Sequence, residues 1–325
     1  MLRKFLLAAA AVSFATAGFA ADLPSKKSVP TLAAAEPSAI HGFMDFGYAN
    51  GRVTGGGVPL YKSGAVLLQS DVGVEIDLYK NKTGFINSVS VFVGAWAESL
   101  NNPAAGGKRM QEYDWWAGAS VGFADHFKLT AQSLQFQIQS TSPAPQVVVK
   151  NATLALAYDD AHLGLPIALN PSATIFYNMD GGATAMGWGK TGTYRVDLAI
   201  APGYSFQKSA GIPLSFSVPT SISMGPTNMY YLSTYKGCGA ATSSSTGSAC
   251  STNTFQMFST GLQAKYDLGQ IIPKKFGSWS AKAGVQYYQF LSDAIKANQS
   301  GSTFVAPAAR KSNSTVISAG LGVSF

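Results

Sequence analysis

Apolar and polar residues alternate along most of this chain, and this pattern restricts the possible fold more than any other feature. In the clearest run, Leu68 to Tyr79, Leu, Val and Ile share one parity while Gln, Asp and Glu share the other. Successive side chains of a strand point to opposite faces, so such a run forms a strand with one apolar and one polar face. A helix would scatter the same charges around its circumference. Residues 112–123 repeat the pattern, with small and polar residues on the second face.

The alternation predicts an all-β, single-domain chain of about 12 antiparallel strands between Ile40 and Phe325. The expected strands are residues 40–50, 64–80, 84–99, 110–124, 126–140, 146–159, 170–179, 191–206, 212–224, 254–267, 278–291 and 314–325. The links between them are mostly short and long in turn. Short links fall at 80–84, 124–126 and 207–211, and long ones at 51–63, 100–109, 180–190, 225–253 and 292–313. The links at 141–145, 160–169 and 268–277 depart from this rule.

The first residues have the form of a cleaved export signal. Arg3 and Lys4 precede an apolar and small-residue run from Phe5 to Ala20, after which the chain turns polar. The run is shorter than the ~20 apolar residues that a spanning helix needs. We therefore expect residues 1–20 to be a signal peptide cut after Ala20, and residues 21–39 to be an extended lead-in to the folded domain.

The composition is unusual for a soluble enzyme. Charged residues make up 12% of the chain and hydrophobic residues 46%, whereas about 25% of a typical soluble domain is charged. Beyond the first 20 residues no long apolar run explains this deficit, but strands with one lipid-facing side would. The formal net charge is +7, yet basic residues are not interleaved with aromatic ones, so nucleic acid is not an expected partner.

Two β architectures fit the alternation, a soluble sandwich and a closed barrel in a membrane. A sandwich needs polar side chains on its outer faces. A barrel needs apolar ones there, and closure pairs every backbone donor and acceptor within lipid. Because the apolar parity holds Val, Ile, Leu, Phe and Tyr in strand after strand, the sequence favours a transmembrane antiparallel barrel.

The last residues carry a resemblance to a known class. From Ile317 to Phe325 every odd position is apolar, and the chain stops on an aromatic residue. In this feature the sequence resembles Gram-negative outer-membrane β-barrel proteins of the porin-like kind, and the strand pattern extends the resemblance over nearly the whole chain after residue 39. The resemblance implies an integral barrel in the outer membrane, with short links in the periplasm and long ones outside. It also implies that the barrel-assembly machinery recognises the final strand through Phe325.

Aromatic residues are frequent on the parity assigned to lipid, often near strand ends, as in the interface girdles of such barrels. These residues are Tyr48, Tyr79, Tyr113, Trp115, Tyr158, Tyr194, Tyr266, Trp279 and Tyr287. Trp116 has the opposite parity and is expected to fill part of the lumen.

The charges on the inward parity are the most informative functional signal. The acidic ones lie on the second and fourth predicted strands, the basic ones on the fifth, eighth, tenth and eleventh. They are Asp71, Glu75, Asp77, Glu112 and Asp114, against Lys128, Arg195, Lys265 and Lys282, with Asp197 as the exception beside Arg195. Opposed charges across a hydrated constriction would favour polar solutes. Alternatively, the same charges pair across the lumen and plug it, because 12 strands lie between filled and open barrels.

The remaining reactive side chains suggest stabilisation rather than catalysis. Cys238 and Cys250, the only two cysteines, lie in a Ser/Thr/Gly-rich link and are expected to form a disulfide that staples an outer loop. Of the three histidines, only His41 is placed to face the lumen near a strand, and it lies at the periplasmic end. No catalytic residue, cofactor or metal site is therefore predicted.

The sequence thus favours a passive outer-membrane porin for small hydrophilic solutes. Three alternatives stay open: a structural barrel with a closed lumen, a barrel that carries apolar small molecules, and, least favoured, an outer-membrane lipid hydrolase. The sequence does not indicate the solute or the oligomeric state.

Overall fold

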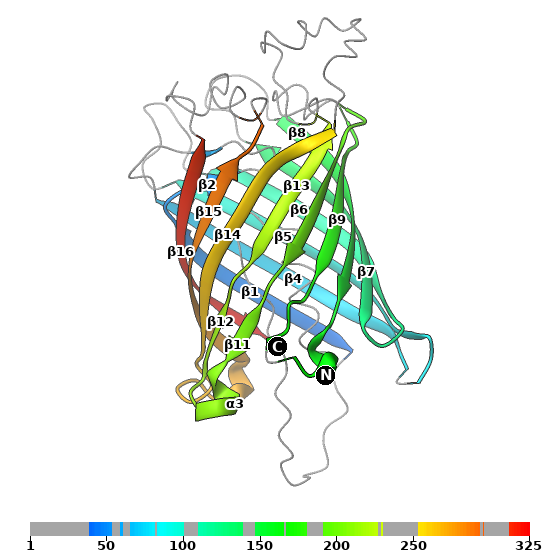
Figure 1. Ribbon diagram of the computed structural model, residues 1–325. Coiled ribbons are helices and arrows are strands. Elements are labelled where there is room, and N and C mark those ends of the chain that lie inside the picture. Colours follow the sequence, from blue (N-terminus) through cyan, green and yellow to red (C-terminus); the bar gives the residue numbers. More distant parts are fainter. Residues whose placement is uncertain are drawn as a thin grey trace, which may run out of the picture.

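The computed structural model is a closed antiparallel barrel of 12 strands, tilted against the barrel axis (Figure 1). The structure describes residues 39–53, 59–60, 66–81, 83–100, 110–138, 147–165, 167–180, 191–226, 229, 253–292, 295 and 312–325. The expected signal peptide, almost all of the lead-in, and both cysteines lie outside these residues.

Each strand pairs with its neighbour in the sequence, and the last strand pairs with the first, which closes the sheet. Around the barrel the strands are β1 (Ile40–Ala49), β4 (Leu67–Lys80), β5 (Ile86–Leu100), β6 (Met110–Phe123), β7 (Phe127–Ile138), β8 (Val147–Tyr158), β9 (Ser172–Asn178), β10 (Tyr194–Ile200), β13 (Thr220–Pro226), β14 (Asn253–Asp267), β15 (Ser278–Phe290) and β16 (Asn313–Ser324). The predicted fold class is therefore confirmed, and most strand bounds agree within a few residues.

Two predicted strands are interrupted by proline. The eighth divides at Pro202 into β10 and β11 (Gly203–Ser205), and the ninth divides at Pro219 into β12 (Leu214–Ser217) and β13. Proline has no N–H to give to a ladder. The carbonyl groups of both prolines are still paired: Val218 N–H donates to the Pro202 carbonyl at 2.8 Å, and Gly261 N–H donates to the Pro219 carbonyl at 3.0 Å. The sheet therefore continues past both breaks, since β11 pairs with β12 and β12 with β14.

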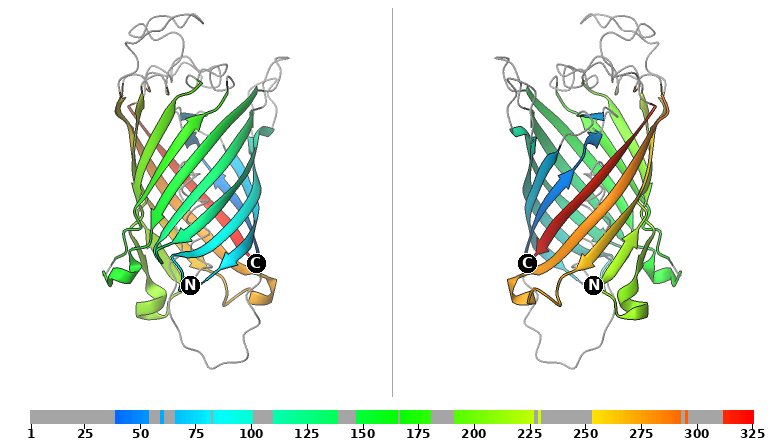
Figure 2. Two further views of the ribbon diagram at one scale, coloured as in Figure 1. Left: turned by 90° about the vertical axis from the view of Figure 1, so that its right-hand side faces the viewer. Right: turned by 90° about the vertical axis from the view of Figure 1, so that its left-hand side faces the viewer.

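The links at the lower rim include a tight turn and short helical segments. At the lower rim, where β1 begins, lie the turn at 124–126 and three short helices, η2 (Ala161–Leu163), α3 (Phe206–Ala210) and η5 (Lys274–Phe276). Figure 2 shows α3 and the final residue at this same rim. No helix among the described residues is long and apolar enough to cross a membrane.

The barrel closes at the lower rim through the last residue. Gly42 N–H donates to the Phe325 carbonyl at 2.9 Å, and Phe325 N–H donates to the Gly42 carbonyl at 3.0 Å. A Cβ at Gly42 would collide with the Phe325 ring, so this glycine provides the space that the ring occupies. The ladder between β1 and β16 is thus completed by the terminal aromatic residue.

The outer face of the sheet is apolar. Large apolar side chains that stay exposed share the parity that the sequence assigns to lipid, among them Leu68, Val72, Val74, Ile76, Val93, Trp115, Leu154, Ile175, Leu198, Leu262, Ile317 and Leu321. Tyr48, Tyr79, Tyr194 and Tyr266 are exposed on the same face. The buried side chains therefore lie inside the barrel.

One long upper link folds partly into the barrel, a position that the sequence does not predict. Part of residues 51–63 forms a separate two-stranded ribbon, β2 (Arg52–Val53) paired with β3 (Pro59–Leu60). Val53 is completely buried, in an apolar cluster with inward residues from the upper ends of the strands. The cluster consists of Ala49, Val53, Leu67, Leu100, Met229, Met257, Tyr288, Phe290, Ile295 and Val316. Periodicity could not predict this, because burial of a link depends on contacts distant in sequence.

Candidate functional site

The inner face of the barrel is rich in buried polar side chains. Besides the charged residues treated below, they include Ser90, Ser120, Thr130, Gln132, Thr153, Thr174, Asn178, Ser223, Gln256, Ser259, Gln263, Ser280 and Gln286. They come from strands all around the sheet. The inward parity therefore surrounds the barrel axis with hydroxyl, amide and carboxyl groups.

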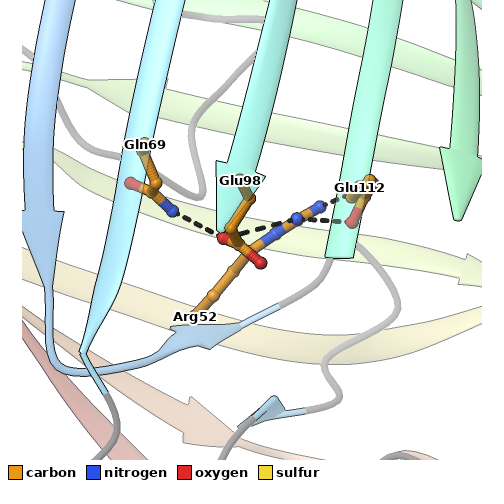
Figure 3. Close-up of polar contacts among 4 residues, drawn as sticks. All are labelled: Arg52, Gln69, Glu98 and Glu112. Carbon is orange, nitrogen blue, oxygen red and sulfur yellow. Dashed lines mark hydrogen bonds and ion pairs between the residues drawn. The ribbon is translucent and has the colours of Figure 1, made fainter. Parts of the chain in front are cut away.

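The upper part of the lumen holds a charged cluster that the sequence reading identified only in part. Arg52 reaches from β2 to the wall, where Nη1 donates to Glu112 Oε2 at 2.7 Å and Nη2 to Oε1 at 3.2 Å (Figure 3). Glu98 Oε2 lies 3.8 Å from Arg52 Nη1 and accepts a hydrogen bond from Gln69 Nε2 at 2.8 Å. The guanidinium also lies over the Trp96 ring, 4.7 Å from its centroid.

Burial and the neighbouring charges shift the pKa of Arg52 in opposite directions. Burial by itself lowers the pKa of the guanidinium, but Glu112 and Glu98 raise it further, so the pKa ends above its ordinary value. Arg52 therefore carries a positive charge in a confined, acidic environment. Neither Arg52 nor Glu98 was predicted as a site residue. The parity of Glu98 was a usable signal, since it matches the inward Trp96, whereas the position of Arg52 depends on how the link folds.

The acidic wall of the cluster is continuous across two strands. Glu98 and Glu112 are cross-strand partners on β5 and β6, and both are almost fully buried. Asp114 is 2% exposed, and neither of its carboxylate oxygens has a hydrogen-bond partner of acceptable geometry among the described residues. Three carboxyl groups thus face one guanidinium.

A second pair of charges lies on the wall at β1, β16 and β15. Lys282 forms an ion pair with Asp45, whose Cα partner on the next strand is Asp71. Glycine makes the pair possible, because Asp45 lies opposite Gly322 and a Cβ there would collide with the carboxylate. Lys265 lies directly opposite Lys282 in the β14–β15 ladder. The predicted residues Asp71, Lys265 and Lys282 are thereby arranged along one band of the wall.

An aromatic layer also occupies the interior, as the parity of Trp116 predicts. Trp116 is 3% exposed and stacks on Phe43 with 6.1 Å between ring centroids, while Phe92 lies 5.7 Å away at a tilt. The indole covers Gly94 and Gly73, where any Cβ would collide with it. These rings therefore fill part of the lumen beside the acidic wall.

The predicted charges near the lower rim also find partners. His41 Nε2 lies 2.6 Å from Asp77 Oδ2, and Lys80 forms an ion pair with the same carboxylate. Glu75, the cross-strand neighbour of His41, is buried, and Lys128 on β7 is half-buried. The lower end of the lumen is therefore charged as well.

On the far wall, Arg195 and Asp197 form a pair within one strand. Arg195 Nη2 lies 2.8 Å from Asp197 Oδ2, and the guanidinium covers the Phe176 ring at 4.0 Å. The sequence predicts an acidic wall separated from a basic wall, but the structure brings opposite charges together at three places. These are this pair, the Lys282–Asp45 pair and Arg52 beside Glu112. The interior is better described as a set of local pairs with an excess of carboxyl groups near β5 and β6.

Several buried polar atoms of the inner face lack a hydrogen-bond partner among the described residues. They include Asn151 Oδ1, Thr153 Oγ1, Thr174 Oγ1, Asp197 Oδ1 and Gln286 Oε1. Buried polar atoms are normally satisfied by protein or by ordered water. Their distribution over β8, β9, β10 and β15 indicates that the interior suits water.

The remaining predictions concern the two cysteines and metal binding. Cys238 and Cys250 lie outside the described residues, so their disulfide stays a prediction. Within the described ranges no group of three or more His, Cys, Asp or Glu side chains is arranged to hold a metal ion.

No family model and no curated protein matches this chain. Among solved structures it is similar to an outer membrane channel from Pseudomonas putida F1, at 11% identity and a TM-score of 0.40, over 92% of this chain and 100% of that one. It is also similar to the outer membrane phospholipase A of Escherichia coli, at 8% identity and a TM-score of 0.39, over 87% and 92%. The translocator domain of the autotransporter NalP from Neisseria meningitidis gives 12% identity and a TM-score of 0.37, over 89% and 90%.

Proposed function

We propose that this protein is a narrow, passive channel for small hydrophilic solutes in a bacterial outer membrane. The observation that carries the proposal is the division of side chains between the two faces of the closed sheet. Large apolar side chains remain exposed outside, and polar and charged ones are buried inside. An outer face of this extent is unusual for a soluble protein, whereas a closed barrel with a polar interior suits lipid.

The proposal includes the route to the membrane. Residues 1–20 act as a cleaved export signal, the lower rim faces the periplasm, and the barrel-assembly machinery recognises the strand that ends at Phe325. The resemblance of the final strand to outer-membrane barrels supports this route, as does the short turn at 124–126 of the lower rim.

The inner face is better suited to contact with water and ions than with apolar molecules. Hydroxyl, amide and carboxyl groups line it, and several of their atoms lack protein partners. A lumen of about 12 strands is wide enough to hold some water beside its side chains, since ~8 strands are filled and ~16 leave an open pore.

One observation favours a second candidate, a barrel whose lumen is closed. The apolar cluster at the upper end brings Val53, Met229 and Ile295 from the links together with inward residues of the strands. If these residues stay together in the membrane, water does not pass them. The two candidates predict opposite results in a conductance measurement.

The experiment is to refold the protein, insert it into a planar bilayer in potassium chloride and record the current. Stepwise openings that scale with protein concentration support the channel, provided that protein denatured before insertion gives none. Silence at high protein concentration, in samples that show β-sheet circular dichroism, supports the closed barrel. The proposal assigns no catalytic step, so hydrolysis of phospholipid by the same sample would contradict it.

A further inference from the structure

The guanidinium of Arg52 contacts two carboxylates and an aromatic ring. Both Nη atoms of Arg52 donate to the two carboxylate oxygens of Glu112, at 2.7 and 3.2 Å, so the interaction is bidentate, with the guanidinium fork on one carboxylate. Glu98 adds a second carboxylate at 3.8 Å, and the face of Trp96 adds a ring at 4.7 Å. A planar fork on a carboxylate combined with an aromatic face is the arrangement that recognises a guanidinium group.

The wall of this site is more acidic than one guanidinium requires. Glu98 and Glu112 are cross-strand neighbours, and Asp114 follows on the same face of β6. Asp114 is 2% exposed, and neither carboxylate oxygen meets a hydrogen-bond partner of acceptable geometry among the described residues. The wall therefore holds a third buried carboxyl group beyond the two carboxylates that lie within 4 Å of Arg52.

The wall and its occupant belong to different parts of the fold. Trp96, Glu98 and Glu112 are held by the β5–β6 ladder, and Gln69 of β4 fixes Glu98 through a 2.8 Å hydrogen bond (Figure 3). Arg52 instead comes from β2, a two-residue strand outside the barrel sheet. The wall is therefore held by the barrel sheet, whereas its occupant comes from a link outside that sheet.

We propose that Trp96, Glu98 and Glu112 form a binding site for one guanidinium group inside the lumen, and that Arg52 occupies this site in the absence of solute. Solutes that carry a guanidinium compete with Arg52 for the same carboxylates. This inference rests on the proposed function for the access of solute to the lumen, and it assigns the channel a preference for cationic, guanidinium-bearing solutes.

The test uses methylguanidinium chloride as the probe and the potassium current of the refolded protein as the readout. In Arg52→Ala the site is vacant, so methylguanidinium should reduce the current at a concentration at least about tenfold lower than in the parent. The factor follows because a tethered competitor acts at an effective concentration in the millimolar range or above. Arg52→Lys should fall between them, because lysine keeps the charge but lacks the fork.

Two double variants separate this site from a general effect of charge. Arg52→Ala with Glu112→Gln removes the carboxylate that the fork contacts and should abolish the tight block. Arg52→Ala with Glu75→Gln removes one buried carboxylate of β4 near the lower rim, outside this acidic wall, and it should be blocked like Arg52→Ala alone. Equal block in both double variants, or equal block in Arg52→Ala and the parent, overturns the proposal.

The site can fail independently of the channel. If neither the parent nor Arg52→Ala conducts, the proposed function fails, and binding is then read from thermal unfolding of the refolded protein in detergent. Methylguanidinium, compared with sodium chloride at equal concentration, should raise the unfolding temperature of Arg52→Ala but not of the double variant with Glu112→Gln. No difference between these two proteins refutes the site. If Arg52→Ala does not refold, Arg52→Lys replaces it in the same comparisons. The site is then refuted if methylguanidinium blocks Arg52→Lys only at the concentration that blocks the parent.

Discussion

At the scale of single residues, glycines determine which charges can meet. Lys282 reaches Asp45 across β16 because Gly322 offers no side chain between them. A Cβ at Gly322 would collide with the Asp45 carboxylate and approach Lys282 Nζ to 3.0 Å. Gly47, also on the inward parity of β1, differs, because the nearest atom to its Cβ position is the Ala319 carbonyl oxygen at 3.7 Å. The two glycines therefore form a matched pair for mutagenesis.

We expect Gly322→Ala to lower the free energy of unfolding by about 1–3 kcal/mol, the usual cost of overpacking. Gly47→Ala should change it by less than about 1 kcal/mol, since the new methyl group meets only ordinary contacts. Urea unfolding of the two refolded variants, followed by tryptophan fluorescence, measures both values. Equal stabilities would show that the ion pair does not depend on the space at Gly322.

At the scale of elements, the strands could be predicted from the sequence. Whether a link folds into the barrel or away from it could not. A strand is a local pattern, so Leu68 to Tyr79 predicts β4 without knowledge of its neighbours. Pro202 and Pro219 indicate the interruptions of the eighth and ninth predicted strands. The prediction missed them because it relied on the period-two pattern, which continues on both sides of each proline. The burial of Val53 and Arg52 had no such signal, because a Gly-rich link can run outside or inside and only distant contacts decide. The predicted inward charges could be found by parity, but their partners, such as Asp45 for Lys282, depend on the tilt and register of the strands.

The assignment of faces can be tested on β4. Val74 lies near the middle of this strand on the outer face, and Leu78 lies on the same face near the lower rim. Val74→Arg should destabilise the barrel by about 2–4 kcal/mol and Leu78→Arg by about 0–1 kcal/mol, because the cost of arginine falls from the bilayer midplane to the interface. Reversible unfolding in lipid vesicles gives both values. A neutral Val74→Arg would mean that this face does not contact lipid.

The closing ladder provides another test at this scale. Phe325 completes the pairing of β16 with β1 through Gly42, and its ring remains exposed at the rim. We expect Phe325→Asp to prevent assembly and to leave the protein in the periplasm, whereas Phe325→Tyr, which keeps an aromatic ring, should assemble. Membrane fractionation of cells that express each variant measures this. Normal assembly of Phe325→Asp would contradict the role assigned to the terminal ring.

At the scale of the whole molecule, the account depends on a hydrated interior reached by solutes. The basic side chains inside the barrel are not equivalent in this respect. Lys282 forms an ion pair with Asp45, so reversing its charge would also place two carboxylates together. Lys265, its half-buried cross-strand neighbour, is a second basic side chain on the inner face and lies opposite another lysine in the ladder. Lys274, exposed in the lower-rim helix η5, offers the same substitution outside the strands.

The most direct test of the account is the reversal potential of the refolded protein across a planar bilayer in a potassium chloride gradient. The account predicts a measurable current in the parent and a shift of the reversal potential towards cation selectivity in Lys265→Glu, which changes the lumen charge by two units. Lys274→Glu should shift it far less, because water and salt screen an exposed charge outside the lumen. Absence of current in every protein, or equal reversal potentials in Lys265→Glu and the parent, would contradict the claim that the polar interior of this barrel is the path of solutes.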